Sequence, residues 1–312
     1  AEAELASPAT ADLVLRLPIA RSEMPLVRLA ERIAADPPLL VTEASTAMFA
    51  DLGALAPSAA VATALSEPFV RGRLALPEYR PADLGPMVLS ADGAPAPQGT
   101  TAPAFIAVLP APSDGPRPVV VFQHGGGQSP EELFQIAGPL GRAGFAFVAI
   151  DLPEHGARAA TGGAAGDLAF LVLDDPIRTR ENFRQATADH LALIAGLPLI
   201  EAELERLLGV TDPIDETQVY YTGLSLGGIT GSVTSAVSHD LAGSALFVGG
   251  GGFGDLLRYG IFASVAGRLV RAPEPRPSVA LAILETILAA ADPLSYARTA
   301  EDRMAPPRPL LF

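Results

Sequence analysis

The residues whose spacing most directly suggests chemistry are Gly223, Ser225 and Gly227, which form a G-x-S-x-G pattern. The preceding residues 219–222 are β-branched or aromatic, as in a buried strand, and a stretch of small residues typical of a helix follows. A serine on a sharp turn between a strand and a helix has its hydroxyl held clear of the backbone, where it can act as a nucleophile. The turn also places the N–H of Leu226 at a helix start, where it can stabilise an oxyanion. The alternative is a tight turn that uses a small polar residue.

A serine nucleophile needs an adjacent base, and a histidine oriented by a carboxylate usually supplies it. The sequence contains four histidines, at positions 124, 155, 190 and 239. His190 falls within a predicted helix before the nucleophile strand, on a packed or a solvent face. His239 is at the far end of the helix after Ser225, which places it roughly 20 Å from the hydroxyl at 1.5 Å per residue. None of the four is well placed as the base.

The elements that must position Ser225 follow from runs of apolar residues and from turn residues. The predicted strands are 69–79, 104–109, 119–122, 145–150, 219–222, 245–248 and 308–312, and the predicted helices are 129–142, 178–195, 200–208 and one from the serine to about 237. Ser129 is the predicted N-cap of the first of these helices. Alternating strands and helices predict an α/β fold, a mostly parallel, doubly wound sheet with helices on both faces. Chemistry collects at the carboxyl ends of such strands, which is where Ser225 and the run His124–Gly127 fall.

Residues 249–307 interrupt this alternation. Apolar residues at helical spacing predict one amphipathic helix around 256–269 and a second around 279–287. We therefore predict a helical cap insertion at 252–305, within a core domain at 67–312; the alternative is that these helices only cover the sheet. Residues 1–66 carry no chemical motif and are predicted to be an N-terminal appendage or the remnant of a domain.

The composition excludes several classes of function. Hydrophobic residues make up 49% and charged residues 18% of the 312 residues, which is typical of a globular protein. A formal net charge of −14 argues against nucleic acid or an anionic membrane surface as the main partner. The absence of cysteine excludes disulfides and thiolate zinc sites, and no apolar run is long enough to span a bilayer. We expect neither a metal nor an organic cofactor.

Three motifs together give the chain a resemblance to the α/β-hydrolase family, over roughly residues 69–312. They are Ser225 within its glycine pattern, His124-Gly125-Gly126 after one predicted strand, and Asp151-Leu152-Pro153-Glu154-His155-Gly156 after the next. More narrowly, residues 121–125, 180–185 and 223–227 are similar to segments of secreted or surface bacterial lipases and lysophospholipases, which carry a β-rich N-terminal region.

The resemblance implies a role for each residue of these motifs. Ser225 would be the nucleophile, supported by Gly223 and Gly227, and the N–H groups of Leu226 and Gly126 would hold the oxyanion. Gly127 or Gln128 could replace Gly126 as a donor. His124, with Gly125, would order the oxyanion loop, and His155 would also be structural.

In this family the acid and the histidine follow the serine in the chain. Residues 308–312 are predicted to be the next core strand, so the resemblance places the acid and the histidine C-terminal to Phe312. We therefore expect the chain to be truncated there, and DNA sequence beyond Phe312 would test this. Asp255 is the one acid at a tolerable place within the chain and is a weak candidate, because a charge at a helix N-terminus explains it better.

The function predicted from these residues is a carboxylic ester hydrolase, an esterase or lipase that acts through a serine acyl-enzyme on small-molecule or lipid esters. One alternative is a binding or scaffold protein on a hydrolase fold, because the sequence offers no usable histidine. Another is a serine peptidase or acyltransferase on the same fold. The chain begins Ala-Glu-Ala-Glu-Leu, without a basic and apolar leader, which fits a removed signal or a trimmed chain. We expect a secreted or surface protein, and a cytoplasmic one stays open.

Overall fold

The computed structural model describes residues 21–83, 85–112, 115–159, 169–172, 174–260, 277–297, 299 and 310–311. One large sheet organises these residues, in the strand order β1-β2-β4-β6-β5-β7-β8-β9, with β3 paired to β2. The strands are β1 (Leu40–Ala47), β2 (Phe69–Glu78), β3 (Gly99–Thr101), β4 (Ala104–Val108), β5 (Arg117–Gln123), β6 (Ala146–Ile150), β7 (Ile214–Leu224), β8 (Leu241–Phe247) and β9 (Leu310–Leu311).

The sheet has an antiparallel half and a parallel half. Strands β1, β2, β4 and β6 pair antiparallel in turn, whereas β6, β5, β7, β8 and β9 pair parallel. Helices connect the parallel strands: α3 (Leu133–Arg142) lies between β5 and β6, α5 (Pro176–Ala195) and α6 (Leu197–Leu208) between β6 and β7, and α7 (Leu226–Val237) between β7 and β8. This arrangement confirms the predicted α/β fold class: a doubly wound sheet whose parallel half is connected by helices, with antiparallel strands added at one side.

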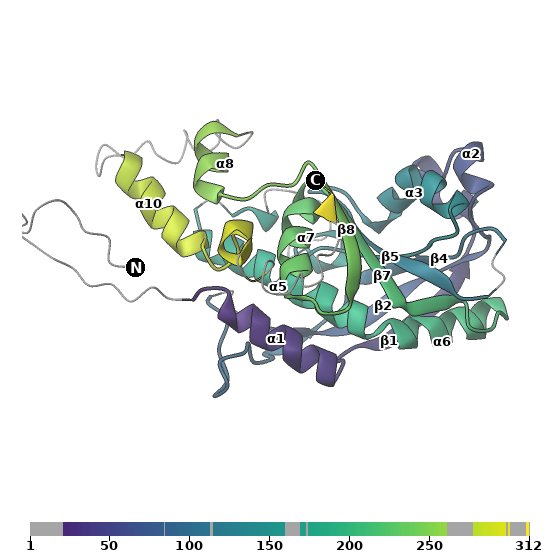
Figure 1. Cartoon of the computed structure of the whole chain (residues 1–312), viewed down its shortest axis with the longest axis horizontal. Helices are drawn as coiled ribbons and strands as arrows, with labels where there is room; N and C mark the ends of the chain where they lie inside the picture. The colour runs from purple at the N-terminus through teal and green to yellow at the C-terminus, as the bar shows by residue number, and fades with distance from the viewer. Residues whose placement is uncertain are drawn as a thin grey trace, which may run out of the picture.

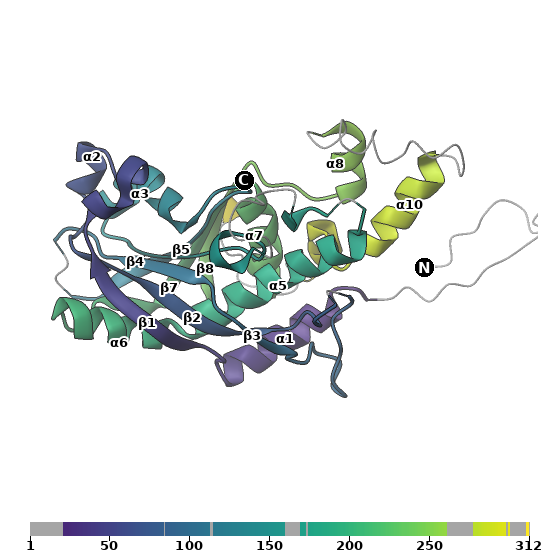
Figure 2. The same ribbon diagram turned by 180° about the vertical axis from the view of Figure 1, so that it is seen from behind.

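Both faces of the sheet are covered, and alternate residues of each strand belong to different cores. On β5, Val119 and Val121 pack in the core beneath α5 and α6, whereas Val120 and Phe122 pack in the core beneath α3. Figures 1 and 2 show α2 (Ala59–Ala62) and α3 on one side of the sheet and α6 on the other. Burial on both faces explains why this strand reads as a continuous apolar run in the sequence.

Part of the N-terminal region belongs to the same sheet. Strand β1 pairs with β2 from Leu40 opposite Ala75 to Ala47 opposite Phe69. Helix α1 (Met24–Ala35) packs in a hydrophobic cluster with residues of α5 and α7. Residues 1–20 lie outside the described residues. The predicted boundary at residue 66, between an N-terminal appendage and the core, stays a prediction.

The helix predicted to begin after Ser129 starts differently. Its first turn is a separate 3₁₀ helix at Pro130–Glu132, and the α-helix α3 begins only at Leu133. Ser129 is the N-cap residue of that 3₁₀ helix, as predicted, but its side chain makes no capping hydrogen bond. Pro130 is the first residue of the helix and has no N–H, so one fewer backbone group at this helix end lacks an acceptor.

Two helices after β8 pack at the end of the sheet where β7 meets α7. They are α8 (Phe253–Tyr259) and α10 (Pro277–Leu288), and they share a cluster with Leu226 and Ile229 of α7. The carboxylate of Asp292 joins them, because it accepts hydrogen bonds from Gly252 N and Phe253 N at the start of α8 (2.8 and 2.6 Å). Positions 261–269 of the first predicted cap helix lie outside the described residues.

Candidate active site

Ser225 lies on a strained turn between β7 and α7. Its backbone has φ 53° and ψ −110°, a positive φ that a residue with a side chain rarely adopts. Its N–H donates to Phe247 O on the neighbouring strand (2.9 Å), and its carbonyl accepts from Ile229 N in the first turn of the helix (3.0 Å). These bonds fix the turn from both sides. The Ser225 side chain is partly exposed and makes no hydrogen bond to any described residue.

The two glycines of the pattern allow a close approach of backbones. A Cβ atom on Gly223 would lie 2.2 Å from Gly227 O, and one on Gly227 would lie 2.3 Å from Gln123 O. Both neighbours are backbone atoms that cannot rotate away. The turn after β7 is therefore pressed against the end of β5, and only glycine fits at these two positions.

The three glycines after β5, Gly125–Gly127, lie beside Ser225 and are called the glycine run below. Gln123, the last residue of β5, pairs with Gly223 of β7. A Cβ atom built on Gly125 would lie 3.4 Å from Ser225 Cβ and 3.3 Å from Leu224 O. The structure thus brings together two motifs that are about a hundred residues apart in the sequence, as expected for the carboxyl ends of adjacent parallel strands.

The backbone N–H groups of the run differ in whether they are bonded. Gly125 N donates to Gln128 Oε1 (2.9 Å), and Gly127 N donates to His155 Nε2 (3.0 Å). Gln128 N donates to Gly125 O at 3.4 Å. Gly126 N has no acceptor among the described residues. Of the candidate donors in this run, Gly126 is therefore the one whose N–H stays available.

The second candidate donor is the N–H of Leu226. Leu226 is the first residue of α7, so its N–H has no acceptor within the helix. The described part of the chain offers it no other acceptor. The helix dipole adds partial positive charge at this end, which favours an anion.

His124 lies buried beneath the glycine run, with none of its surface exposed. Its Nε2 accepts a hydrogen bond from Leu152 N (3.2 Å), so the ring proton resides on Nδ1, which donates to Gly125 O (2.7 Å). Burial lowers the pKa of His124 to about 3. The ring is neutral at physiological pH and acts as a fixed link between Leu152 and Gly125.

His190 is also a buried, neutral link. It lies on α5, where its Nε2 contacts Gln123 Oε1 (2.7 Å) and its Nδ1 contacts Thr234 Oγ1 on α7 (3.0 Å). Burial lowers its pKa to about 3. It lies on a packed face, one of the two placements that the sequence left open.

No described residue bonds to Ser225 Oγ as a base would. All four histidines lie within the described part of the chain. His239 follows the end of α7, away from the turn at residues 223–227, which we call the elbow. Asp255 lies in the first turn of α8. This is where the alternative interpretation, a charge at a helix N-terminus, places it.

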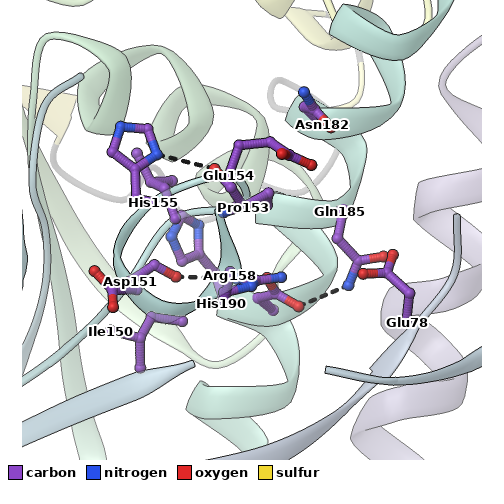
Figure 3. Close-up of polar contacts among 12 residues, drawn as sticks. Glu78, Ile150, Asp151, Pro153, Glu154, His155, Arg158, Asn182, Gln185 and His190 are labelled. Atoms are coloured by element: carbon purple, nitrogen blue, oxygen red, sulfur yellow. Dashed lines mark hydrogen bonds and ion pairs between the residues drawn. The ribbon is translucent and has the colours of Figure 1, made fainter. Parts of the chain in front are cut away.

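A network of buried charges lies around the segment that carries His155 and was not predicted from the sequence; Figure 3 draws Glu154, His155 and Arg158 of this segment. Arg158 pairs with Asp189 (2.7 Å), and Arg80 pairs with Glu154 (2.9 Å), all four side chains being at most 6% exposed. These residues come from the segment just after β2, from the segment after β6 and from α5. One feature of the sequence could have indicated these buried charges. The predicted helix 178–195 carries many charged residues and lacks a clear apolar stripe.

An apolar groove of about 730 Å³ lies on the sheet face that carries α3. Residues of α3, β7 and β8 line it, among them Ile136, Tyr220 and Phe247. It reaches Leu224, but Ser225 does not line it.

Neither a metal site nor a membrane span is found in the part of the chain that the structure describes. There, no group of three or more His, Asp or Glu side chains could hold a metal ion. The helices described there are too short or too polar to cross a bilayer.

No protein-family model matches the chain, and no curated protein matches it. Among solved structures, the chain is similar to an acetyl xylan esterase from Paenibacillus sp. R4, with 14% identity and a TM-score of 0.48 over 95% of this chain and 93% of that one. It is also similar to a putative dienelactone hydrolase from Klebsiella pneumoniae subsp. pneumoniae MGH 78578, with 18% identity and a TM-score of 0.33 over 48% of this chain and 55% of that one.

A third similar structure is a putative acetyl xylan esterase from Bacteroides fragilis NCTC 9343, with 13% identity and a TM-score of 0.40 over 72% of this chain and 51% of that one. The chain thus spans about half the length of the Klebsiella and Bacteroides proteins and nearly all of the Paenibacillus one.

Proposed function

We propose that the protein is a carboxylic ester hydrolase and that Ser225 is its nucleophile. The observation that carries this proposal is the strained serine beside two N–H groups, of Gly126 and Leu226, that have no acceptor among the described residues. A turn that only connects a strand to a helix needs neither feature. Backbone strain that the surrounding structure maintains at a partly exposed polar residue is characteristic of a functional site.

In the proposed reaction, Ser225 Oγ bonds to the acyl carbon of the ester as its proton passes to a base. The carbonyl π electrons move to the oxygen, and the Gly126 and Leu226 N–H groups stabilise the oxyanion. When the carbonyl re-forms, the C–O bond to the alcohol breaks, and the alcohol takes the proton. Water then hydrolyses the acyl-enzyme by the same steps. Each oxyanion donor supplies about 10²–10³-fold of rate in comparable sites.

The reaction also requires a general base that the described residues do not place at Ser225. We propose a histidine oriented by an acid, as in other serine hydrolases. His124 and His190 are excluded from this role, because their ring nitrogens are bonded within the core and their pKa values are about 3. Asp255 is retained as a candidate acid.

We infer that the substrates are hydrophobic esters. The support is the cluster that adjoins the elbow, where Leu226 and Ile229 pack with Phe253 and Leu257 of α8. These side chains are buried against one another, so the support is only the apolar character of the residues around the turn, since ligand sites are lined mostly by hydrophobic side chains. Esters of increasing acyl length test this inference through their kcat/KM values, which should rise from the acetyl ester to longer chains.

The proposed nucleophile is tested by labelling the full-length protein with a fluorophosphonate probe. We expect the probe to modify Ser225, identified by mass spectrometry of the peptide that contains it. The Ser225→Ala variant is the matched control and should take no label. A wild-type protein that hydrolyses no ester and leaves Ser225 unlabelled would reject the proposal.

The second candidate function is a binding or scaffold protein that lacks a working triad. The observation that favours it is that no described histidine bonds to Ser225 Oγ. Such a protein would bind an ester without releasing an alcohol, so measuring release from a nitrophenyl ester separates the two functions. A serine peptidase would also cleave the matching anilide, whereas an acyltransferase would pass the acyl group to an added alcohol. We also propose a secreted or surface location, which cell fractionation would test.

A further inference from the structure

The segment after β6, residues 151–158, contacts the glycine run at two points. Leu152 N donates to His124 Nε2 (3.2 Å), and His155 Nε2 accepts from Gly127 N (3.0 Å). The proton of His155 resides on Nδ1, which donates to Pro153 O within the same segment (2.9 Å). Figure 3 shows His155 and Pro153 close together in this segment. In both histidines, therefore, Nε2 is unprotonated and can accept a hydrogen bond from a backbone N–H group.

These bonds fix the two peptide planes on either side of Gly126. A trans peptide is planar, and its C=O and N–H point in opposite directions. The bond from His124 Nδ1 to Gly125 O therefore sets the direction of Gly126 N–H, which belongs to the same plane. The bond from Gly127 N to His155 sets the next plane. Because glycine has the widest conformational freedom, the run needs such outside restraints to keep one geometry.

Buried ion pairs hold the segment that carries His155. Arg158 Nη1 donates to Asp151 O (3.0 Å) and pairs with Asp189 on α5 (2.7 Å). Glu154, next to His155, pairs with Arg80 at the end of β2 (2.9 Å). Glu154 has φ 60°, a strained backbone that persists because these partners restrain it.

We propose that His155 is a positioning residue for the oxyanion donor Gly126, and that the Arg158–Asp189 pair holds His155 in place. His155 acts through Gly127 and does not touch the substrate. This inference rests on the proposed function, since it assigns His155 a part in the same site. The geometry behind it, a histidine acceptor on Gly127 N, can be tested without any catalytic activity.

The first test compares His155→Phe with His155→Gln in the full-length protein. Phenylalanine keeps an aromatic ring beside Phe170 but has no acceptor, whereas the glutamine Oε1 can accept from Gly127 N. For a nitrophenyl ester we expect His155→Phe to lower kcat about 10- to 100-fold with KM little changed, because displacing a catalytic group slightly has effects of this size. His155→Gln should recover most of the loss. If His155→Phe keeps the wild-type kcat, the inference is overturned.

Amide hydrogen exchange gives a readout that separates this inference from the proposed function. We expect the Gly127 amide to exchange slowly in the wild type and in His155→Gln, and at least tenfold faster in His155→Phe. Wild type that hydrolyses no ester would reject the proposed function, and the exchange rates would still decide the geometry. Equal exchange rates at Gly127 in all three proteins would overturn the inference.

The second test removes the ion pair without leaving one charge buried alone. Arg158→Met could prevent folding, because it leaves Asp189 buried without its partner. The double variant Arg158→Met/Asp189→Leu removes both charges and is the variant to measure. We expect it to fold, with faster exchange at Gly127 and lower kcat than wild type. A folded double variant with wild-type kcat and wild-type exchange would exclude the ion pair from positioning His155.

Discussion

Gly126 and Ser225 show how little side-chain chemistry the proposed site needs. The glycine contributes one backbone N–H, and the serine contributes one hydroxyl on a turn with φ 53°. Neighbouring residues hold these two groups in place. His124 bonds to Gly125 O beside Gly126, and Gly223 and Gly227 allow the close packing of the turn that carries Ser225. The site is therefore most sensitive to changes in backbone geometry.

Removing the Gly126 N–H should lower turnover without abolishing substrate binding. Gly126→Pro has no N–H, so we expect kcat for an ester to fall about 10²–10³-fold with KM little changed. Gly126→Ala keeps the N–H and is the matched control. Steady-state kinetics measure both variants. Equal kcat values for the two variants would show that this N–H does not stabilise the transition state.

The close approach at Gly227 predicts a loss of stability rather than of chemistry alone. A Cβ atom there would lie 2.3 Å from Gln123 O, a backbone atom, so Gly227→Ala forces the elbow and β5 apart. We expect the free energy of unfolding to fall by about 1–3 kcal/mol, as for other overpacked positions. Gly99→Ala is the control, because nothing lies within 4 Å of its added Cβ. Urea denaturation would compare the two, and an unchanged midpoint for Gly227→Ala would contradict the prediction.

At the scale of single elements, α5 ties together the strands and helices around the site. His190 lies in its C-terminal half and contacts Gln123 at the end of β5 and Thr234 on α7. Its buried ring has a pKa of about 3, against about 6.5 in an unfolded chain. Between these pH values the unfolded state binds a proton that the folded state does not bind. Stability from this group is therefore present above about pH 6.5 and is lost as the pH falls.

A His190→Gln variant isolates this effect from the other titrating groups. We expect the free energy of unfolding of wild type, minus that of the variant, to fall by about 1.4 kcal/mol per pH unit between about pH 6 and 4. Glutamine does not titrate, so the variant lacks this term. Chemical denaturation of both proteins at several pH values gives the difference. A difference that stays constant with pH would mean that His190 titrates alike in the folded and unfolded states.

The sequence predicts elements well where residues are buried on both sides or bracketed by turn residues. Strand β5 was predicted because its buried positions form a continuous apolar run, and the elbow was predicted from the spacing of its glycines. Strand β1 was missed, because Leu40–Ala47 is an edge strand with mostly exposed or half-exposed residues. No apolar run or strict alternation distinguishes such a strand from a loop.

The ion pairs of the site could not be predicted for a different reason. Arg80 contacts Glu154, and Arg158 contacts Asp189, across separations of many residues that only the folded sheet brings together. In the sequence, charges at these positions look like an ordinary solvated surface. Their burial depends on the packing of α5 against β2, which short-range patterns do not encode.

At the scale of the whole molecule, the sheet lies between two hydrophobic cores, one on each of its faces. Leu133 lies in the core beneath α3, and Ile200 lies in the core beneath α5 and α6, both fully buried. We expect Leu133→Ala to cost about 2–5 kcal/mol of unfolding free energy and Ile200→Val about 0.5–1.5 kcal/mol. The double variant should lose the sum within about 0.5 kcal/mol, because the sites share no neighbours. A larger deviation in urea denaturation would show that the two cores are coupled through the sheet.

The order of the motifs along the chain has a consequence for biosynthesis. Strands β5 and β6, the glycine run and both histidines that bond to it lie within residues 117–158, and β7 with its serine comes later. Chains leave the ribosome N-terminal end first, and domains begin to fold as they emerge. A nascent chain therefore contains the glycine run with its Gly126 N–H before Ser225 and the second donor, the Leu226 N–H, have been translated, and Asp189 can reach Arg158 only when α5, which carries it, has been made.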